Sequence, residues 1–267
     1  MEKIGLIAGN RKFPIFVSEN AKKKNYYIIA VGIKEQTLPG LRRYVDKLYW
    51  LELTEFPRLV QIFKSEGVKN IIMAGQISPY LLFDKKLSNN AEIKIILDSI
   101  KDKKADTIFG AIAQRLKEAG LELLDSTLFV KEFLPKRGTL TKREPNFSEW
   151  EDIYFGLDLA KMIAFLDIGQ TVAVKQKAIL AIEALEGTDS LIRRAGRLCG
   201  GGFVVVKVSK PQQDMRFDIP VIGLNTVKNL IKSKASCLAL ESEKTLFLDQ
   251  EESIRLANRY DLCIIAV

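Results

Sequence analysis

The sequence contains no histidine among its 267 residues. This absence excludes a Ser-His-Asp triad, a Cys-His nucleophile, a zinc site with histidine ligands and a 2-His-1-carboxylate iron site. Acid–base chemistry would therefore have to use Asp, Glu, Lys, Tyr or Cys side chains, or a water molecule bound to a metal ion.

Cysteine is scarce as well. Cys199, Cys237 and Cys263 lie far apart and form no C-x-x-C pair, so they are too few for a soft-metal site and unsuited to a disulfide framework. No apolar run is long enough to cross a bilayer, and residues 1–10 lack the pattern of a signal peptide. These absences predict a cytoplasmic protein that is not integral to a membrane.

The charge balance is basic, with 41 Lys and Arg residues against 33 Asp and Glu residues and a formal net charge of +8. Such an excess is compatible with nucleic acid, a phosphorylated small molecule or an anionic leaflet as partner. The sequence has no recognition helix, RNP signature or zinc finger, so we expect no nucleic-acid partner.

The first half of the chain alternates buried-strand patterns with helix-forming segments. The expected strands cover residues 3–9, 26–33, 47–51, 70–74 and 121–125. Helices are expected from Pro14 to Lys24, from Pro57 to Gly67 and, in two pieces, within 91–120. This alternation predicts an α/β fold with a parallel sheet and helices on both faces.

Residues 134–145 interrupt this pattern with two prolines, a glycine and five charged side chains. Such a composition predicts a linker or a functional loop. The S-x-x-E pattern from Ser148 to Glu151 then predicts a capping box at the start of a long helix.

The second half mixes hairpin and alternating patterns. A hairpin is expected from residues 170–175 and 178–185, followed by a helix over 188–199 and a strand over 203–208. The tail predicts helices near 225–234 and 250–259, with strands near 236–248 and 261–266. We therefore expect two domains, residues 1–133 and residues 134–267, with the linker and its helix at 134–167.

Glycine-containing turns follow two of the expected strands, Gly9-Asn10 after the first and Gly75-Gln76 after the strand over 70–74. In a doubly wound sheet both turns would lie at the carboxyl edge, where ligands bind, and glycine lets backbone amides approach a phosphate. The third glycine of the dinucleotide fingerprint is missing. The alternative is therefore that Gly9 only permits a tight turn.

A carboxylate-rich stretch followed by two arginines comprises Glu183, Glu186, Asp189, Arg193 and Arg194. Glu183 interrupts an apolar strand, and a charge buried there would need a partner or a metal ion. An arginine near the start of a helix can hold a phosphate with two hydrogen bonds. The alternative is that Glu183 faces solvent and that Thr188 or Asp189 caps the next helix.

A third candidate is the loop that carries Asp214, Arg216 and Asp218, preceded by Lys207 and Lys210. Carboxylate oxygens suit Mg²⁺ or Mn²⁺, which takes one or two carboxylates together with water and substrate phosphate. The alternative is a solvated loop in which Asp214 pairs with Arg216.

Together these motifs resemble the UDP-2,3-diacylglucosamine diphosphatases of the LpxI type. The resemblance rests on residues 5–14, 138–141, 169–175, 183–196 and 207–226. One departure is Asn10-Arg11, where a glycine-rich turn is expected.

The resemblance implies an α/β protein with a Rossmann-like N-terminal domain and a family-specific mixed α/β C-terminal domain. It implies hydrolysis of UDP-2,3-diacylglucosamine to UMP and 2,3-diacylglucosamine 1-phosphate (lipid X) in lipid A biosynthesis. The expected cofactor is Mg²⁺ or Mn²⁺, and water attacks the α-phosphorus. Peripheral contact with the inner membrane and assembly into a homo-oligomer are compatible with this activity.

On this interpretation the catalytic residues are Asp214, Asp218, Glu183, Glu186 and Lys207, and Asp214 and Asp218 also bind the metal ion. The expected substrate-binding residues are Gly9, Asn10, Gly75, Gln76, Thr141, Lys175, Thr188, Asp189, Arg193, Arg194, Lys210 and Arg216. One alternative is a nucleotide-sugar-binding module without catalysis. Another is a Rossmann-type oxidoreductase, against which the incomplete glycine fingerprint counts.

Overall fold

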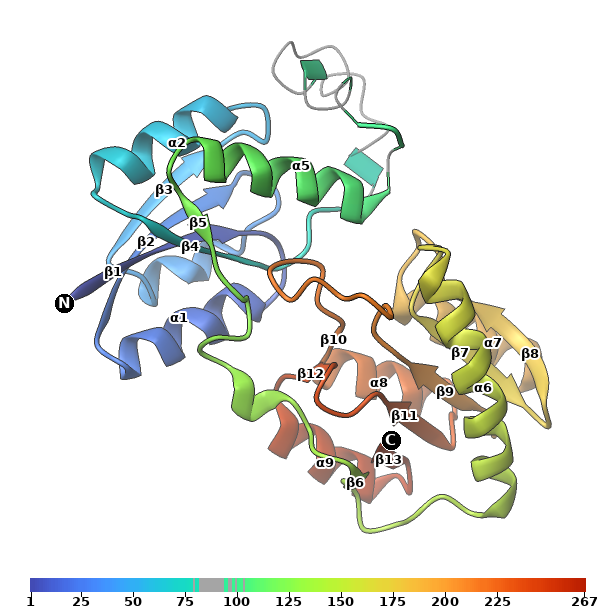
Figure 1. Cartoon of the computed structure of the whole chain (residues 1–267). Coiled ribbons are helices and arrows are strands. Elements are labelled where there is room, and N and C mark those ends of the chain that lie inside the picture. Colours follow the sequence, from blue (N-terminus) through green and yellow to red (C-terminus); the bar gives the residue numbers. More distant parts are fainter. Residues whose placement is uncertain (79, 82–93, 96–97, 99, 103) are drawn as a thin grey trace. The chain divides into compact units, whose positions relative to one another are not determined.

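The chain folds as two compact units (Figure 1). The computed structural model describes residues 1–78, 80–81, 94–95, 98, 100–102 and 104–267. Unit 1 consists of residues 1–131 together with the short segment 214–218, and unit 2 of residues 132–213 and 219–267. The segment 214–218, which we expected in the second domain, thus packs with the first unit.

Unit 1 is built on a five-stranded sheet in the order β3-β2-β1-β4-β5, with all neighbours parallel. The strands are β1 (Glu2–Ala8), β2 (Tyr26–Ile33), β3 (Lys47–Leu51), β4 (Asn70–Ala74) and β5 (Glu122–Leu123). This confirms the predicted α/β fold with a parallel sheet. The strand order reverses between β1 and β4, so the carboxyl ends of these two strands form the switch point of the sheet.

Helices cover both faces of this sheet (Figure 1). They are α1 (Phe13–Lys23), α2 (Phe56–Ser65) and α5 (Ala105–Glu118), and short 3₁₀ helices are η1 (Pro39–Arg43) and η3 (Lys131–Phe133). Side chains of α2 and α5 share one core cluster with the sheet. The helix α5 corresponds to the second predicted piece within 91–120, whereas most of the first piece lies outside the described residues.

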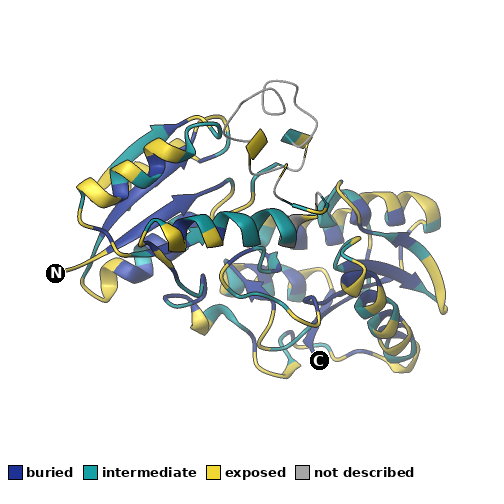
Figure 2. Ribbon diagram, turned by 45° about the horizontal axis from the view of Figure 1, so that its top comes forward, coloured by how far each residue is buried: buried dark blue, intermediate teal, exposed yellow. Residues whose placement is uncertain are grey.

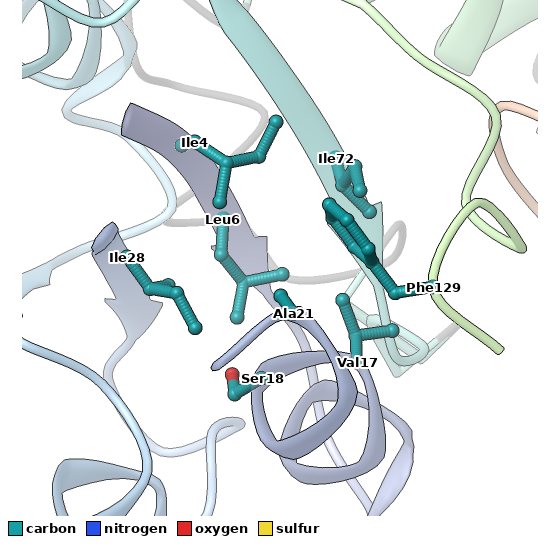
Figure 3. Close-up of a pocket in the computed structure, with 9 residues that line it drawn as sticks. Ile4, Leu6, Val17, Ser18, Ala21, Ile28, Ile72 and Phe129 are labelled. Carbon is teal, nitrogen blue, oxygen red and sulfur yellow. The ribbon is translucent and has the colours of Figure 1, made fainter. Parts of the chain in front are cut away.

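The opposite face of the sheet packs against α1. Val17 and Ala21 of this helix lie against Leu6 and Ile72 of the strands, and Phe129 closes the contact (Figure 3). The small space that they line is apolar, and we interpret it as internal packing rather than a binding site.

Unit 2 has a six-stranded mixed sheet in the order β6-β13-β11-β9-β7-β8. Its strands are β6 (Gly138–Thr139), β7 (Thr171–Lys175), β8 (Ala178–Ile182), β9 (Val204–Lys207), β11 (Cys237–Leu240) and β13 (Cys263–Ala266). The hairpin of β7 and β8 was predicted, whereas β6 falls in the segment expected to be a loop. A separate parallel pair is formed by β10 (Val221–Ile222) and β12 (Leu246–Phe247).

One helix packs on one face of this sheet and three pack on the other. The first is α6 (Phe147–Phe165), and the other three are α7 (Thr188–Cys199), α8 (Leu224–Lys232) and α9 (Gln250–Arg259). The strands of both units are largely buried, and outward-facing helix residues are exposed (Figure 2). Among the described residues, no helix combines the length and apolarity that crossing a membrane requires.

The helix α6 begins two residues earlier than the S-x-x-E pattern predicts. The capping box is formed by Asn146, whose side chain accepts from the Glu149 amide, and by Glu149, whose side chain accepts from the Asn146 amide, both at 2.9 Å. The prediction that Ser148 and Glu151 form the box was wrong. The box forms at Glu149 because the guanidinium of Arg143 donates to both Glu149 carboxylate oxygens, at 2.7 and 3.0 Å. These hydrogen bonds fix Glu149 at the third position of the helix.

Candidate functional site

A buried lysine and a buried glutamate lie side by side in unit 2. Lys207 ends β9 and Glu183 follows β8, with exposed fractions of 5% and 8%. The Lys207 Nζ and Glu183 Oε2 atoms are 3.7 Å apart. The alternative in which Glu183 faces solvent was therefore wrong, because its side chain is buried against Lys207.

Two threonines complete this cluster. Thr171 begins β7 and pairs in register with Lys207, and Thr188 begins α7. Lys207 Nζ donates to Thr171 Oγ1 at 3.2 Å and to Thr188 Oγ1 at 2.8 Å, and the Thr188 hydroxyl donates to Glu183 Oε1 at 2.7 Å. The neighbouring strands β9, β7 and β8 thus bring the cluster together.

The polar groups of this cluster satisfy one another. An ammonium group has three protons, and Lys207 directs its own toward Thr171, Thr188 and Glu183. Glu183 Oε2 also accepts from the Gln170 amide at 3.4 Å. The arrangement is that of a closed internal network, which holds three strands and the start of α7 in place.

The same network keeps Glu183 ionised. Burial alone would raise the pKa of the Glu183 carboxyl, but the Lys207 charge and the hydrogen bonds from Thr171, Thr188 and the Gln170 amide outweigh it, and the pKa is lowered. A carboxylate with a lowered pKa is a poor proton acceptor at neutral pH. A catalytic role of Glu183 stays a prediction.

The two carboxylates that follow Glu183 in the sequence, Glu186 and Asp189, bind other partners. Glu186 pairs with Arg194 at 2.8 Å, and Asp189 accepts from Asn225 at 2.8 Å and from Thr226 at 3.1 Å. Asp189 thus links the start of α7 to the start of α8.

Neither Thr188 nor Asp189 caps α7. The N-cap residue is Gly187, with no hydrogen bond from a capping side chain. The prediction of a side-chain cap at Thr188 or Asp189 was wrong, because the Thr188 hydroxyl is taken up by Lys207 and Glu183 and the Asp189 carboxylate by α8.

Three more predicted substrate-binding residues make contacts inside unit 2. Lys175 Nζ donates to the Gly201 carbonyl at 2.7 Å, and the buried Lys210 pairs with Asp167 at 2.7 Å. The Thr141 hydroxyl bonds to the backbone of β13, where it accepts from the Ile264 amide at 3.0 Å. Each contact ties a loop or a strand end to its surroundings, and substrate binding by these residues stays a prediction.

The loop with Asp214, Arg216 and Asp218 is anchored in unit 1. The Ser126 amide donates to the Met215 carbonyl at 2.8 Å. Phe217 is buried and stacks on Phe109 of α5 with ring centroids 5.5 Å apart. These contacts explain why a segment from the second half of the sequence packs with the first unit.

Asp214 and Arg216 form a local ion pair in this loop. The guanidinium of Arg216 reaches both carboxylate oxygens of Asp214, at 2.6 Å for the shortest contact. These hydrogen bonds lower the pKa of the Asp214 carboxyl despite its partial burial. The local pair of the alternative interpretation is thus confirmed, whereas its solvated loop is not, because Phe217 is buried.

The two glycine turns of unit 1 touch at the switch point of the sheet. The Gly9 amide donates to the Ala74 carbonyl and the Asn10 amide to the Gln76 carbonyl, both at 2.8 Å. A Cβ atom on Gly9 would lie 2.6 Å from the Gln76 carbonyl oxygen, and one on Gly75 would lie 2.6 Å from the Asn10 carbonyl oxygen. Close backbone approach therefore accounts for both glycines, and ligand contact there stays a prediction.

The donor set for a divalent cation is limited. The described residues contain no group of three or more Asp, Glu or Cys side chains placed to hold a metal ion. A site of one or two carboxylates completed by water and phosphate oxygens remains chemically suited to Mg²⁺ or Mn²⁺. Asp214 and Asp218, four positions apart in one loop, offer carboxylates of this kind.

Sequence reasoning missed three residues of these networks. Thr171 completes the Lys207 cluster, Asp167 pairs with Lys210, and Glu241 accepts from Lys161 at 2.6 Å and from the Ser209 amide at 2.7 Å. Thr171 could have been found from the sequence, because it is a polar residue at the start of an apolar strand. A charged residue in an apolar run identified Glu183 in the same way.

Comparison with known proteins gives a consistent match over the chain. A model of the LpxI N-terminal domain matches residues 3–133, and a model of the LpxI C-terminal domain matches residues 136–265. The UDP-2,3-diacylglucosamine pyrophosphatase LpxI of Caulobacter vibrioides is 27% identical over 277 residues, which cover 100% of this chain and 98% of that protein.

Solved structures match far less well. N5-carboxyaminoimidazole ribonucleotide synthetase from Thermotoga maritima is 17% identical with a TM-score of 0.25, covering 68% of this chain and 41% of that one. The biotin carboxylase subunit of pyruvate carboxylase is 14% identical with a TM-score of 0.27, covering 70% of this chain and 39% of that one. The chain thus spans about two fifths of these structures, and at such TM-scores they have no bearing on its function.

Proposed function

Because the chain belongs to the LpxI family, we propose that it hydrolyses the diphosphate of UDP-2,3-diacylglucosamine. The products would be UMP and 2,3-diacylglucosamine 1-phosphate (lipid X), in lipid A biosynthesis. The observation that carries the proposal is the full-length match to a relative named as the pyrophosphatase for this compound, together with both family domains in order.

The proposed reaction is attack of water on the α-phosphorus. The new P–O bond joins the water oxygen to the uridylyl phosphorus, and the bridging oxygen leaves with the phosphate of lipid X. The attacking water loses a proton, which passes to the solvent, and negative charge builds up on the phosphoryl oxygens, where cationic groups stabilise it.

The Asp214–Asp218 loop is the best candidate to hold a divalent cation. When bound, Mg²⁺ or Mn²⁺ would lower the pKa of a water molecule and offset phosphate charge. For this role the ion pair of Asp214 with Arg216 would have to open, which would leave Asp214 for the cation and Arg216 for a phosphate. Phe217 anchors this loop in a hydrophobic core, which would keep its carboxylates in a fixed position.

We assign Lys207 and Glu183 to positioning rather than to direct catalysis. Their contacts to Thr171 and Thr188 use their polar groups internally. Glu186 lies in the turn before α7 and forms an ion pair with Arg194, so we place it outside the reaction as well.

The substrate carries two acyl chains, so the enzyme would meet it at a membrane surface. We expect a cytoplasmic protein with peripheral contact to the inner membrane. Assembly into a homo-oligomer stays a prediction.

The test is hydrolysis of UDP-2,3-diacylglucosamine in ¹⁸O-labelled water, with and without EDTA. Attack on the α-phosphorus places the label in UMP, whereas label in lipid X would contradict it. Full activity in EDTA would refute the metal requirement. Tight UDP binding without any product would support the alternative of a nucleotide-sugar-binding module.

A further inference from the structure

The helix α7 has two chemically different faces. Its inner residues Leu191, Ile192 and Ala195 are completely buried against the sheet. Its outer face exposes Arg193, Arg194, Arg197 and Leu198. The fold accounts for the inner face alone, so the composition of the outer face calls for a separate explanation.

Large apolar side chains accompany these arginines. Leu198 is 65% exposed, and Leu185, in the turn before the helix, is 50% exposed. Leu198 lines a shallow groove of about 430 Å³ together with Glu186, Ser190, Arg194 and Arg197. Guanidinium groups and exposed leucines therefore lie together on one surface.

The outer face of α7 is positively charged. Arg194 pairs with Glu186, Arg193 donates to Ser190 Oγ at 3.0 Å, and Arg197 contacts the Arg193 carbonyl at 3.4 Å. With Asp189, which lies one turn before Arg193 and accepts from Asn225, this face has three guanidinium groups and two carboxylates. The excess of positive charge complements an anionic surface.

We propose that the outer face of α7 docks on an anionic membrane surface. Guanidinium groups bind lipid phosphates with paired hydrogen bonds, and exposed leucines insert between the headgroups. Docking would hold the chain at the layer that contains a diacylated substrate. This consequence of docking rests on the proposed function, because the membrane supplies the substrate only if the substrate is a lipid.

The helix α6 fits such a surface less well. It exposes Tyr154, Met162 and Phe165, which are apolar or aromatic, but the exposed carboxylate of Asp158 shares their face by helical spacing. Unlike α7, α6 also has no arginine that could pair with lipid phosphates, so α6 serves as the comparison surface.

The experiment measures co-sedimentation of the full chain with vesicles, in the absence of substrate. We expect binding to vesicles of phosphatidylglycerol and phosphatidylcholine, and much weaker binding to phosphatidylcholine alone. The double variant Arg197→Glu with Leu198→Ser should bind the anionic vesicles roughly tenfold more weakly, since it reverses one surface charge and removes one inserted side chain.

A matched control makes the same two changes in unit 1, where Arg42 and Leu38 are also exposed. The double variant Arg42→Glu with Leu38→Ser should bind like the unaltered chain, as should Met162→Ser with Phe165→Ser on α6. The proposal is overturned if the unaltered chain ignores anionic vesicles, if the α7 variant binds normally, or if either control loses binding equally.

Folding and function are checked separately. The α7 variant should keep the thermal midpoint of the unaltered chain, and it should keep turnover of substrate dispersed in detergent. If the unaltered chain did not turn over the substrate, that result would count against the proposed function. The vesicle-binding measurements would still test the docking surface by themselves.

Discussion

The ammonium nitrogen of Lys207 lies 3.7 Å from a carboxylate oxygen of Glu183, and both side chains are shielded from water. Thr188 connects them, since it accepts from Lys207 and donates to Glu183. Because both charges are buried, each depends on the other for its stability. The pair therefore makes a measurable contribution to the fold of unit 2.

The variant Lys207→Met should lower the free energy of unfolding by about 3–5 kcal/mol, because it leaves the Glu183 carboxylate buried without its cation. Adding Glu183→Gln should restore part of this loss, since the second change removes the unpaired charge. Urea unfolding of the two single variants and the double variant measures the coupling. Additive losses would contradict the pairing.

Stability should depend on pH through the same carboxylate. The pKa of Glu183 is lowered in the folded chain, so its stabilising contribution is complete above the unfolded value of about 4.3. That contribution is lost as the pH falls through the folded value. The difference in unfolding free energy between the unaltered chain and Glu183→Gln should therefore be constant near neutral pH and shrink at acidic pH. A difference in unfolding free energy that grows as the pH falls would contradict a lowered pKa of Glu183 in the folded chain.

The contact of the two glycine turns predicts a steric effect. Gly9→Ala should destabilise the fold by about 2 kcal/mol or more, because its Cβ would lie 2.6 Å from the Gln76 carbonyl oxygen. Gly75→Ala adds backbone strain, since Gly75 has a φ of 87°. Thermal unfolding measures both.

The matched control is Gly110→Ala inside α5, where an added Cβ meets nothing within 4 Å. It should stabilise the helix by about 0.5–1 kcal/mol through the better helix propensity of alanine. If Gly9→Ala were as harmless as Gly110→Ala, the two turns would not be in contact.

Local patterns were sufficient for most strands and for the helices of the tail. The runs over 26–33 and 71–74 are continuously apolar because parallel strands are covered on both faces, and this signal lies within the strand itself. The start of α6 was missed by two residues because S-x-x-E and N-x-x-E overlap in the sequence. Arg143, a neighbour outside the pattern, selects between them.

The candidate site depended on contacts that no local pattern contains. Glu183 was recognisable as a charge in an apolar strand, but its partner Lys207 lies far along the chain and reaches it only through the strand order β9-β7-β8. Likewise, Asp214 and Asp218 were recognisable as hard ligands. Their membership of unit 1 follows from Phe217, whose packing against Phe109 is a long-range contact.

The carboxylates of this loop give the most direct test of the proposed reaction. The variants Asp214→Asn and Asp218→Asn should each lower kcat/KM for UDP-2,3-diacylglucosamine by about 100-fold or more, because an amide is a weaker ligand for a hard cation and carries no charge. The expected loss is specific to turnover. Thermal midpoints should fall only slightly, because Asp→Asn preserves the shape of the side chain and Asp214→Asn weakens one partly exposed ion pair with Arg216.

A surface carboxylate provides the comparison. The Asp261 side chain belongs to unit 2 and is 85% exposed, and Asp261→Asn makes the same chemical change in a residue that is not part of the loop. Its kcat/KM should match that of the unaltered chain.

A further variant, Phe217→Ala, tests whether the position of the loop matters as well as its carboxylates. It retains Asp214 and Asp218 but removes the side chain that anchors the loop in the core of unit 1. It should lower the free energy of unfolding by about 3–5 kcal/mol and lower turnover as well. Normal turnover in both aspartate variants would remove this loop from the reaction.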